Sequence, residues 1–269
     1  MNKKVLITGT SSGIGLACVE HFVDAGFRVT ATVRKPEDEK RLKQRFVDIT
    51  VLRLDLKDEK SIDDIIGDHF EKIGGVDIVV NNAGFACIGA VEEVSMDQWR
   101  AQMETNFFAV VNICRLALPY MRKNRDGRII QVSSGVGQSV MPIFAPYCTS
   151  KHALEAFSEA LRFEVSQFGI DVSLVAPGPV TSNFDRNREV PQSSAIEVSP
   201  YKNTIEHIQK STAAVHERES KPEDVVKKII HAATTRRPRF RYSVGPLGFA
   251  AALAKFVPSA IMGWALKPR

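Results

Sequence analysis

Two side chains that can exchange protons stand four positions apart in the stretch PYCTSKHALEAF: Tyr147 and Lys151. The stretch is predicted to begin a helix, in which residues four apart lie one above the other on the same face. The phenol and the ammonium would then point into the same small volume. The spacing alone leaves two interpretations open, a proton-transferring pair or an aromatic residue beside an ordinary surface lysine.

Apolar, β-branched runs alternate with amphipathic segments along the chain around this pair. The predicted strands are Lys4–Thr8, Arg28–Val33, Thr50–Leu54, Val76–Asn81, Arg128–Ser133, Asp171–Ala176 and Arg239–Val244. The predicted helices are Gly15–Ala25, Pro36–Arg45, Ser61–Ile73, Met96–Lys123, Tyr147–Gln167 and Pro222–Thr234, the last with Ser220 as its candidate cap. This order is typical of right-handed βαβ units. The expected fold is therefore α/β, a single Rossmann-type doubly wound parallel sheet of about seven strands with helices on both faces, in one domain of residues 1–269.

Two regions depart from the alternation. Residues 181–219 are polar and poor in strand signals, with one helix expected around Tyr201–His216. Because they follow the sixth strand at the carboxyl end of the sheet, a substrate lid is expected, and a surface excursion without function is the alternative. Residues 245–269 form an apolar extension. Its candidate roles are capping the pocket, packing on another subunit and contacting a membrane surface.

The composition narrows the class of protein. The chain has 269 residues, 44% hydrophobic and 25% charged, enough for a substantial core. A strand-like run begins near the first residue, so no signal peptide is expected. No uninterrupted apolar run reaches about 18 residues, the length expected of a membrane-spanning helix. The four cysteines form no C-x-x-C unit and the six histidines show no ligand spacing. A cytoplasmic protein without a metal site or a disulfide framework is expected.

The net charge of +5 is mildly basic and is densest in RRPRFRY at 236–242. A solvated turn and strand edge is the simpler interpretation of this cluster, and attraction of an anionic ligand or surface is the other. Nothing in the chain resembles a nucleic-acid-binding motif, so no nucleic-acid partner is expected.

A glycine-rich turn in VLITGTSSGIGLA joins the first strand to the first helix. Its glycines let the backbone come close to a diphosphate, and the amides at the positive end of the helix dipole favour that anion. A tight connection without a ligand is the alternative, but the position at the first βα junction favours a nucleotide site. The predicted cofactor contacts in this turn are Gly9, Ser11, Ser12, Gly13, Ile14 and Gly15.

The residues at the end of the second predicted strand indicate which dinucleotide binds. In dinucleotide-binding folds an acid about 20 residues on binds the ribose 2′-hydroxyl of NAD, whereas an arginine there receives the 2′-phosphate of NADP. In VTATVRKPED no acid ends the strand, and Arg34 follows it. A guanidinium holds a phosphate through two hydrogen bonds, although an exposed charged turn is the alternative interpretation of Arg34. NADP(H) is therefore expected, with NAD(H) the less favoured cofactor.

Four motifs follow one another in order: TGTSSGIG, NNAG at 81–84, YCTSK at 147–151 and PGPVTS at 177–182. Together they make the chain resemble the short-chain dehydrogenase/reductase family over about residues 3–245. VTATVRKPED and the apolar ending resemble its steroid- and retinol-dehydrogenase-like branch. The resemblance implies a catalytic set of Asn106, Ser134, Tyr147 and Lys151. Beyond the glycine turn, it implies cofactor contacts from Arg34, Asp55, Leu56, Asn82, Ala83, Gly84, Tyr147, Lys151, Pro177, Gly178, Val180 and Thr181.

The resemblance gives each catalytic residue a role. Tyr147 would be the general acid and base, with Ser134 orienting the substrate oxygen, Lys151 bonding the nicotinamide ribose hydroxyls and Asn106 holding a water in the proton relay. A phenol has a pKa near 10, and a nearby ammonium would lower that pKa toward the working range. The adjacent Ser133 differs from Ser134 only in its spacing to the tyrosine. Asn106 could instead cap or kink its helix, and Asp55 could be a turn residue.

The substrate is less clearly indicated than the cofactor. A pocket covered by the apolar tail and by Phe85, Ile88, Val140, Met141 and Phe144 would suit a large hydrophobic alcohol or carbonyl, such as a steroid, retinoid or lipid. A reductase of 3-oxoacyl thioesters and a non-catalytic NADPH-sensing protein are the alternatives. The family also implies a homodimer or homotetramer, assembled through the long helices 96–123 and 147–167.

Overall fold

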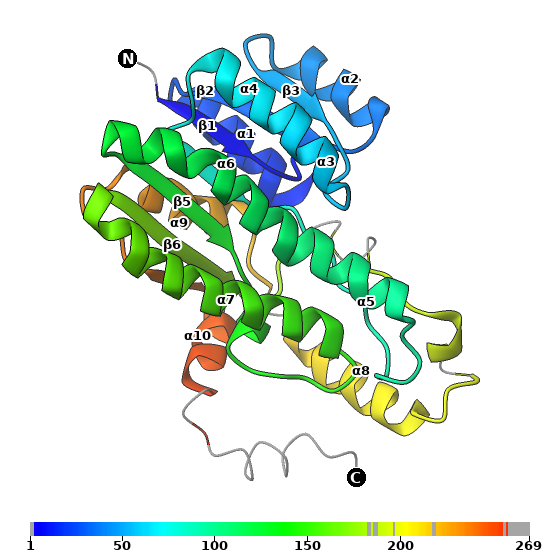
Figure 1. Ribbon diagram of the computed structural model, residues 1–269. Helices are drawn as coiled ribbons and strands as arrows, with labels where there is room; N and C mark the ends of the chain where they lie inside the picture. The colour runs from blue at the N-terminus through cyan, green and yellow to red at the C-terminus, as the bar shows by residue number, and fades with distance from the viewer. Residues whose placement is uncertain are drawn as a thin grey trace.

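The computed structural model describes residues 3–181, 184, 188–195, 197–216, 219–254 and 257. Its centre is a seven-stranded sheet in the order β3-β2-β1-β4-β5-β6-β7, in which every neighbouring pair is parallel (Figure 1). The strands are β1 Lys4–Ile7, β2 Arg28–Val33, β3 Thr50–Arg53, β4 Ile78–Asn81, β5 Gly127–Val132, β6 Ile170–Pro177 and β7 Arg241–Val244. The predicted doubly wound fold is confirmed.

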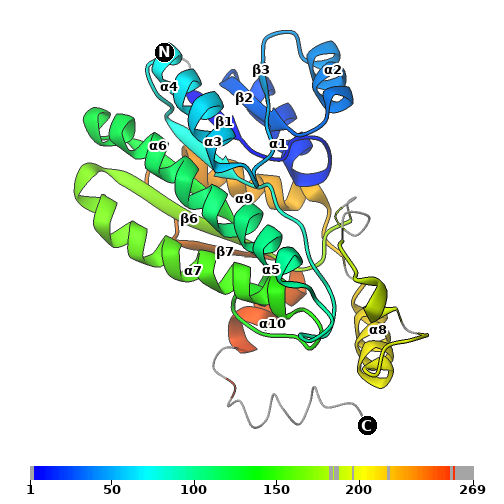
Figure 2. The same ribbon diagram turned by 45° about the vertical axis from the view of Figure 1, so that its right-hand side comes forward.

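Helices cover both faces of this sheet. The α-helices of the described residues are α1 Gly13–Asp24, α2 Pro36–Arg45, α3 Glu59–Ile62, α4 Asp68–Ile73, α5 Met96–Met103, α6 Ala109–Asn124, α7 Ala145–Val165, α8 Lys202–His216, α9 Pro222–Thr234 and α10 Gly245–Ala254. One buried core joins the sheet to α1, α2 and α9, and a second joins it to α3, α4, α6 and α7. Figure 2 shows α6 and α7 on one side of the strands and α9 on the other. Burial on both faces explains why the central strands read as continuous apolar runs.

Two helices predicted as continuous contain a π-helical turn. The segment 61–73 is divided by Asp63–Gly67, and the segment 96–123 by Glu104–Phe108. The second turn carries Asn106, and Figure 1 shows α5 and α6 continuing along one line on either side of it. Apolar periodicity does not distinguish a single wide turn from a regular helix, and such turns are frequent at functional sites.

The start of α9 corrects one prediction. The cap is Lys221, whose backbone N–H donates to the side chain of Asp224 at 3.3 Å, and Ser220 does not cap the helix. Ser220 instead pairs through its backbone, donating to Pro179 O and accepting from Thr181 N, both at 3.0 Å. This pairing ties the segment after β6 to the start of α9.

The lid and the tail lie beyond the layered core. The predicted lid helix is α8, which stands outside the layers in both views. The tail begins as α10, which packs against β6, β7 and the short 3₁₀ turn Gly135–Gly137. Most of the predicted extension beyond Ala254 is outside the described residues. Among the described helices, none is both long and apolar enough to cross a bilayer.

Candidate active site

The sheet brings the predicted site residues to one edge. In parallel strands the carboxyl ends meet, and ligands bind where the strand order reverses, here between β1 and β4. The glycine turn follows β1, the NNAG motif ends β4, Ser134 follows β5 and the PGPVTS motif begins at the end of β6. Four separate stretches therefore converge on the same crevice.

The glycine turn has the shape that a diphosphate requires. Gly9 and Gly13 have φ of +69° and +56°, a region that other residues rarely adopt. A Cβ at Gly15 would lie 2.2 Å from the Gly9 carbonyl oxygen, so a side chain there cannot be accommodated. The first turn of α1 holds no acidic residue, and Ser12 precedes it without a side-chain cap. The bare, positive helix start fits an anionic ligand.

The NNAG motif holds the glycine turn from the neighbouring strand. The Thr8 hydroxyl accepts from the backbone N–H groups of Asn82 and Ala83, both at 3.0 Å. The Asn82 amide donates back to the carbonyls of Thr8 and Gly9 at 2.9 and 3.1 Å. Next to them, Gly84 lies against the Asn106 side chain, where a Cβ would be 3.1 Å from Oδ1. These contacts fix the floor of the crevice.

The predicted adenosine end of the site carries exposed cations. Thr10 is bound to Thr32 O at the end of β2, which places the glycine turn next to Arg34, an exposed residue two positions further on. Sequence reasoning missed Arg41 of α2, whose guanidinium donates to Ser11 O and pairs with Asp38 at 2.8 Å. Arg41 stands seven residues beyond Arg34, on the predicted helix Pro36–Arg45, and its charge was the available signal.

Asp55 and Leu56 lie partly buried in the turn after β3. The Asp55 carboxylate accepts from the Lys57 backbone N–H at 3.0 Å, so it does organise a turn. One carboxylate oxygen is used there, and a contact with adenine stays a prediction.

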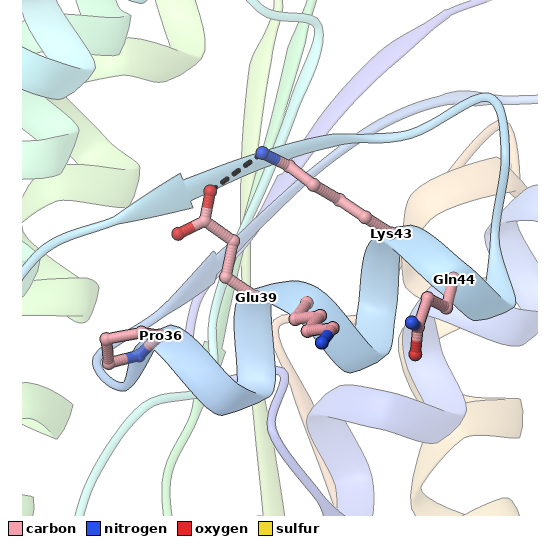
Figure 3. Close-up of a pocket in the computed structure, with 5 residues that line it drawn as sticks. Pro36, Glu39, Lys43 and Gln44 are labelled. Carbon is pink, nitrogen blue, oxygen red and sulfur yellow. Dashed lines mark hydrogen bonds and ion pairs between the residues drawn. The ribbon is translucent and has the colours of Figure 1, made fainter.

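A hollow of about 420 Å³ lies on the outer surface of α2 (Figure 3). It is lined by Pro36, Glu39, Lys40, Lys43 and Gln44, and the Lys43 ammonium binds the Glu39 carboxylate at 2.7 Å across it. These side chains are exposed or half-buried, and their two opposite charges already satisfy each other. None of the residues predicted to be catalytic lines this hollow.

The predicted proton-transfer pair is buried at the start of α7. Tyr147 and Lys151 are 8% and 4% exposed. The ammonium nitrogen lies 5.8 Å from the centre of the tyrosine ring and donates to Val132 O at the end of β5, at 2.9 Å. The surface-lysine interpretation is therefore wrong, and the two side chains share one interior volume.

The hydroxyl groups of Ser134 and Ser133 differ in their hydrogen bonding. A hydrogen bond between the Ser134 and Tyr147 side chains favours the phenolate form of the tyrosine. The Ser133 hydroxyl is buried, and within the described structure it has no hydrogen-bond partner. Strand alternation explains the difference, because consecutive side chains at the end of β5 point to opposite faces. The thirteen-residue spacing thus selected the serine that meets the tyrosine.

The pKa of the tyrosine corrects the expected electrostatics. Burial raises the pKa of Tyr147 to about 12, opposed by the Ser134 hydrogen bond and the charge of Arg188. Burial also lowers the pKa of Lys151 to about 8, opposed by the charge of Glu155. The expected lowering of the tyrosine pKa by the ammonium is therefore not found, because desolvation outweighs the nearby charges. Tyr147 is held as a neutral phenol.

The Asn106 side chain contacts neighbouring segments instead of capping its own helix. Its amide binds both the N–H and the carbonyl of Phe85, at 3.2 and 3.0 Å, and donates to the Ser150 hydroxyl at 3.1 Å. Ser150 in turn donates to Tyr147 O at 2.8 Å. Asn106 thus joins the loop after β4 to the helix that carries the tyrosine, and its part in a proton relay stays a prediction.

The wall around Tyr147 is apolar. Ala86 and Ile88 are buried with it, and Val136, Ile143, Phe144 and Phe184 pack against this cluster. The Phe184 ring lies 5.8 Å from the Tyr147 ring, which brings the lid region onto the catalytic residue. Of the predicted lining residues, Ile88 and Phe144 belong to this wall, whereas Val140 is 59% exposed and does not. Phe85 and Met141 are half-buried nearby in sequence.

The segment predicted to hold the nicotinamide leaves β6 at Pro177. Gly178 N donates to Val244 O at 3.1 Å, and Val180 forms a bridge with Ser220. The Thr181 hydroxyl donates to Glu219 at 2.9 Å. The segment is therefore fixed from β7 and from the start of α9, at the same edge as the tyrosine.

The chain is similar to known proteins over most of its length. A family model described as short chain dehydrogenase matches residues 3–192. The chain belongs to this family. Among its relatives, a 3-ketodihydrosphingosine reductase of Bacteroides thetaiotaomicron is 34% identical, over 98% of this chain and 96% of the relative. An NADPH-dependent 3-dehydrocapnine reductase of Ornithobacterium rhinotracheale is 32% identical, over 90% of this chain and 87% of the relative.

The family also includes solved structures with the same fold. A short-chain dehydrogenase from Streptomyces avermitilis has a TM-score of 0.87 and 29% identity, covering 98% of this chain and 96% of its own. The resemblance drawn from four motifs is confirmed for the short-chain dehydrogenase family, and the chain is an oxidoreductase of that family. The steroid- and retinol-type branch stays a prediction.

Replacing Gly15 by alanine should abolish dinucleotide binding. The new Cβ would collide with the Gly9 carbonyl and with the Asn82 amide, which would lie 2.6 Å away, so the turn must open. Gly67→Ala is the matched control. Gly67 lies within a helical stretch, and its new Cβ would be 3.7 Å from the Leu116 side chain, an ordinary van der Waals contact. Fluorescence titration with NADPH should show at least about a hundredfold weaker binding for the first variant and unchanged binding for the second. Equal binding by both would contradict the assigned site.

Ser134→Ala and Ser133→Ala should differ although the residues are neighbours. The first removes the hydroxyl that meets Tyr147, and turnover should fall by about 10²–10³-fold, the loss typical of one oriented catalytic donor. The second removes a buried hydroxyl without a described partner, so stability and turnover should stay close to wild type. Steady-state kinetics and thermal unfolding measure both. A larger turnover loss in Ser133→Ala would reverse the assignment.

Proposed function

We propose that the chain is an NADP(H)-dependent oxidoreductase that interconverts a hydrophobic alcohol and its ketone or aldehyde. The observation that carries the proposal is the group of buried Tyr147, buried Lys151 and half-buried Ser134, at the sheet edge beside the glycine turn and against an apolar wall. A carbonyl group that binds against this apolar wall would meet the hydroxyls of Ser134 and Tyr147 side by side. The bound nicotinamide would supply or accept the hydride.

NADP(H) is the cofactor that the relatives support. The 3-dehydrocapnine reductase is named as NADPH-dependent, and the protein ElxO, 27% identical with a TM-score of 0.71, was solved with NADP bound. In this chain, Arg34 and Arg41 lie beside the turn at the end of β2, where a 2′-phosphate would need cations. The β2 end carries no acid to repel that phosphate.

The protein groups would manage the proton and the orientation. Tyr147, protonated below a pKa of about 12, would donate its proton to the carbonyl oxygen during reduction. Ser134 would hold that oxygen by a hydrogen bond from its hydroxyl. Lys151, charged below a pKa of about 8, would bind the cofactor ribose and offset charge that develops on the phenol oxygen. In the oxidative direction Tyr147 would accept the proton instead.

A hydrophobic substrate is supported by the side chains around the tyrosine. Ile88, Phe144 and Phe184 supply apolar surface, and both named relatives are reductases, which favours carbonyl reduction as the working direction. The alternatives are reduction of 3-oxoacyl thioesters and NADPH sensing without catalysis. The complete and buried catalytic group weighs against a sensor, because such a group has to be desolvated at a cost.

Assembly and location follow the family expectation. We infer a homodimer or homotetramer through the faces of α5–α6 and α7, supported by Phe108 and Phe163, which are 50% and 66% exposed there. A cytoplasmic location and a membrane contact of the tail remain predictions of the sequence.

A substrate panel with both cofactors tests the proposed function. Purified protein is offered NADPH or NADH with retinal, steroid ketones, long-chain aldehydes, 3-ketodihydrosphingosine and acetoacetyl thioester, and absorbance of the reduced cofactor is followed. An apolar carbonyl should be turned over with NADPH, and Tyr147→Phe should lose at least about 10²-fold of the rate. Turnover of the thioester alone would favour the first alternative. NADPH binding without turnover would favour the sensor.

Arg34→Asp should reverse the cofactor preference. The change removes a guanidinium and adds a charge that repels the 2′-phosphate, so binding of NADPH should weaken by about 10–100-fold while NADH binding is kept or improved. Arg45→Gln is the matched control, because Arg45 is equally exposed on α2 but pairs with Glu20. Titrations of the three proteins with both nucleotides measure the effect. Unchanged NADPH affinity in Arg34→Asp would remove Arg34 from the site.

A further inference from the structure

A partly buried ion pair lies one helical turn behind the predicted catalytic lysine. Glu155 follows Lys151 by four positions on α7, and its side chain is 8% exposed. Arg241, the first residue of β7, donates to one oxygen of that carboxylate from both Nε and Nη2, the first contact being 3.1 Å long. The pair therefore joins the catalytic helix to the edge strand of the sheet.

The same carboxylate is in electrostatic contact with Lys151. Burial favours the neutral amine, whereas the charge of Glu155 favours the ammonium. Tyr147 faces the lysine from the same helix, Arg188 of the lid region acts on Tyr147, and Arg241 stands on the far side of Glu155. Val132 O receives the ammonium proton. Glu155 is thus the anion that opposes desolvation of the lysine in the described structure.

Glu155 also packs against the turn that follows Ser134. A Cβ placed on Gly137 would lie 3.1 Å from the Glu155 side chain, 3.3 Å from Lys151 O and 2.8 Å from the Ser133 hydroxyl. The turn, the lysine backbone and the glutamate are therefore in close packing. A shift of the carboxylate would therefore also displace the turn after Ser134 and the backbone of Lys151.

Stability alone explains this arrangement poorly. Burying two charges costs about as much as their attraction returns, and well-packed apolar residues often serve equally well. The second carboxylate oxygen, Oε1, is buried and has no hydrogen-bond partner within the described residues. The position of this carboxylate has a simpler explanation if it acts on a neighbouring group.

We propose that Glu155, held in place by Arg241, acts as a positioning residue that keeps Lys151 in its ammonium form and so sets the upper pH limit of the reaction. The proposal rests on the proposed function, in which the charged lysine binds the cofactor ribose and supports proton transfer. Glu155 supplies the favourable charge, and Arg241 holds the carboxylate in place while weakening its field at the lysine. Neither residue is assigned a contact with the substrate.

Opposite changes of the pair should move the pH profile in opposite directions. In Glu155→Gln the ammonium loses its anion, so the alkaline limb of kcat/KM for carbonyl reduction should move to lower pH by at least about half a unit. In Arg241→Gln the carboxylate acts without its screening cation, so the limb should move to higher pH. Arg241→Lys keeps the charge and should stay near wild type. A purely structural ion pair predicts equal losses at every pH and no movement of the limb in either variant, and that result would overturn the proposal.

A second measurement separates this proposal from the proposed function. Lysine-selective ¹⁵N and ¹³C labelling, with Lys151→Arg for assignment, gives the titration of the Lys151 ammonium directly in the cofactor-free protein. The titration midpoint should fall in Glu155→Gln and rise in Arg241→Gln, even if no carbonyl is turned over and the proposed function fails. The double variant Glu155→Gln/Arg241→Gln carries neither buried charge and should titrate below wild type. A midpoint unchanged in Glu155→Gln and in the double variant would refute the pair's role, and thermal unfolding confirms that each variant is folded.

Discussion

The close approach of β1 and β4 at their carboxyl ends is the constraint on which the site depends. A Cβ on Gly9 would lie 2.7 Å from the Ala83 Cα, so the two chains touch where the strand order reverses. The Thr8 hydroxyl and the Asn82 amide satisfy the backbone groups that this contact would otherwise leave unpaired. Because the helices after β1 and β4 pack on opposite faces of the sheet, a crevice opens above this contact. The cofactor site is a consequence of the winding of the sheet.

Desolvation governs the catalytic pair more than the charges inside it do. Burial opposes the charged form of both side chains, raising the pKa of Tyr147 and lowering that of Lys151. The change for Tyr147, from 10 to about 12, corresponds to about 3 kcal/mol. For a reductase this cost is useful, because the phenol keeps its proton until a carbonyl oxygen develops charge. The proposed role of Lys151 requires its charged form, so a nearby anion matters for the lysine and not for the tyrosine.

Most of the fold, and the convergence of the predicted cofactor-binding segments on one edge of the sheet, could be predicted from the sequence because their signals are local. β2, α2 and α9 have the predicted bounds, and the glycine turn, Asn82 and Ser134 stand on strand ends that periodicity identifies. The π turn at Asn106 was not predictable in this way, since the Phe85 contacts that go with it come from a loop about twenty residues earlier. Nor was the pKa of Tyr147, because spacing to a lysine says nothing about how much water remains around a phenol.

The substrate half of the site was predicted less well, for a physical reason that also bears on its function. Its wall is built from loops that meet over long sequence separations: Cys87 bridges Glu189, and the Glu93 carboxylate accepts from the hydroxyls of Ser194 and Ser199 at 2.7 and 2.6 Å. Ile143, with a φ of +60° that a β-branched residue rarely adopts, accepts from Gly89 N and joins the same loops. No periodicity marks such contacts, and each can change without disturbing the sheet. The predicted cofactor half is fixed by the winding of the strands, whereas the predicted substrate half is built from these loops, so specificity has to be sought in the loops.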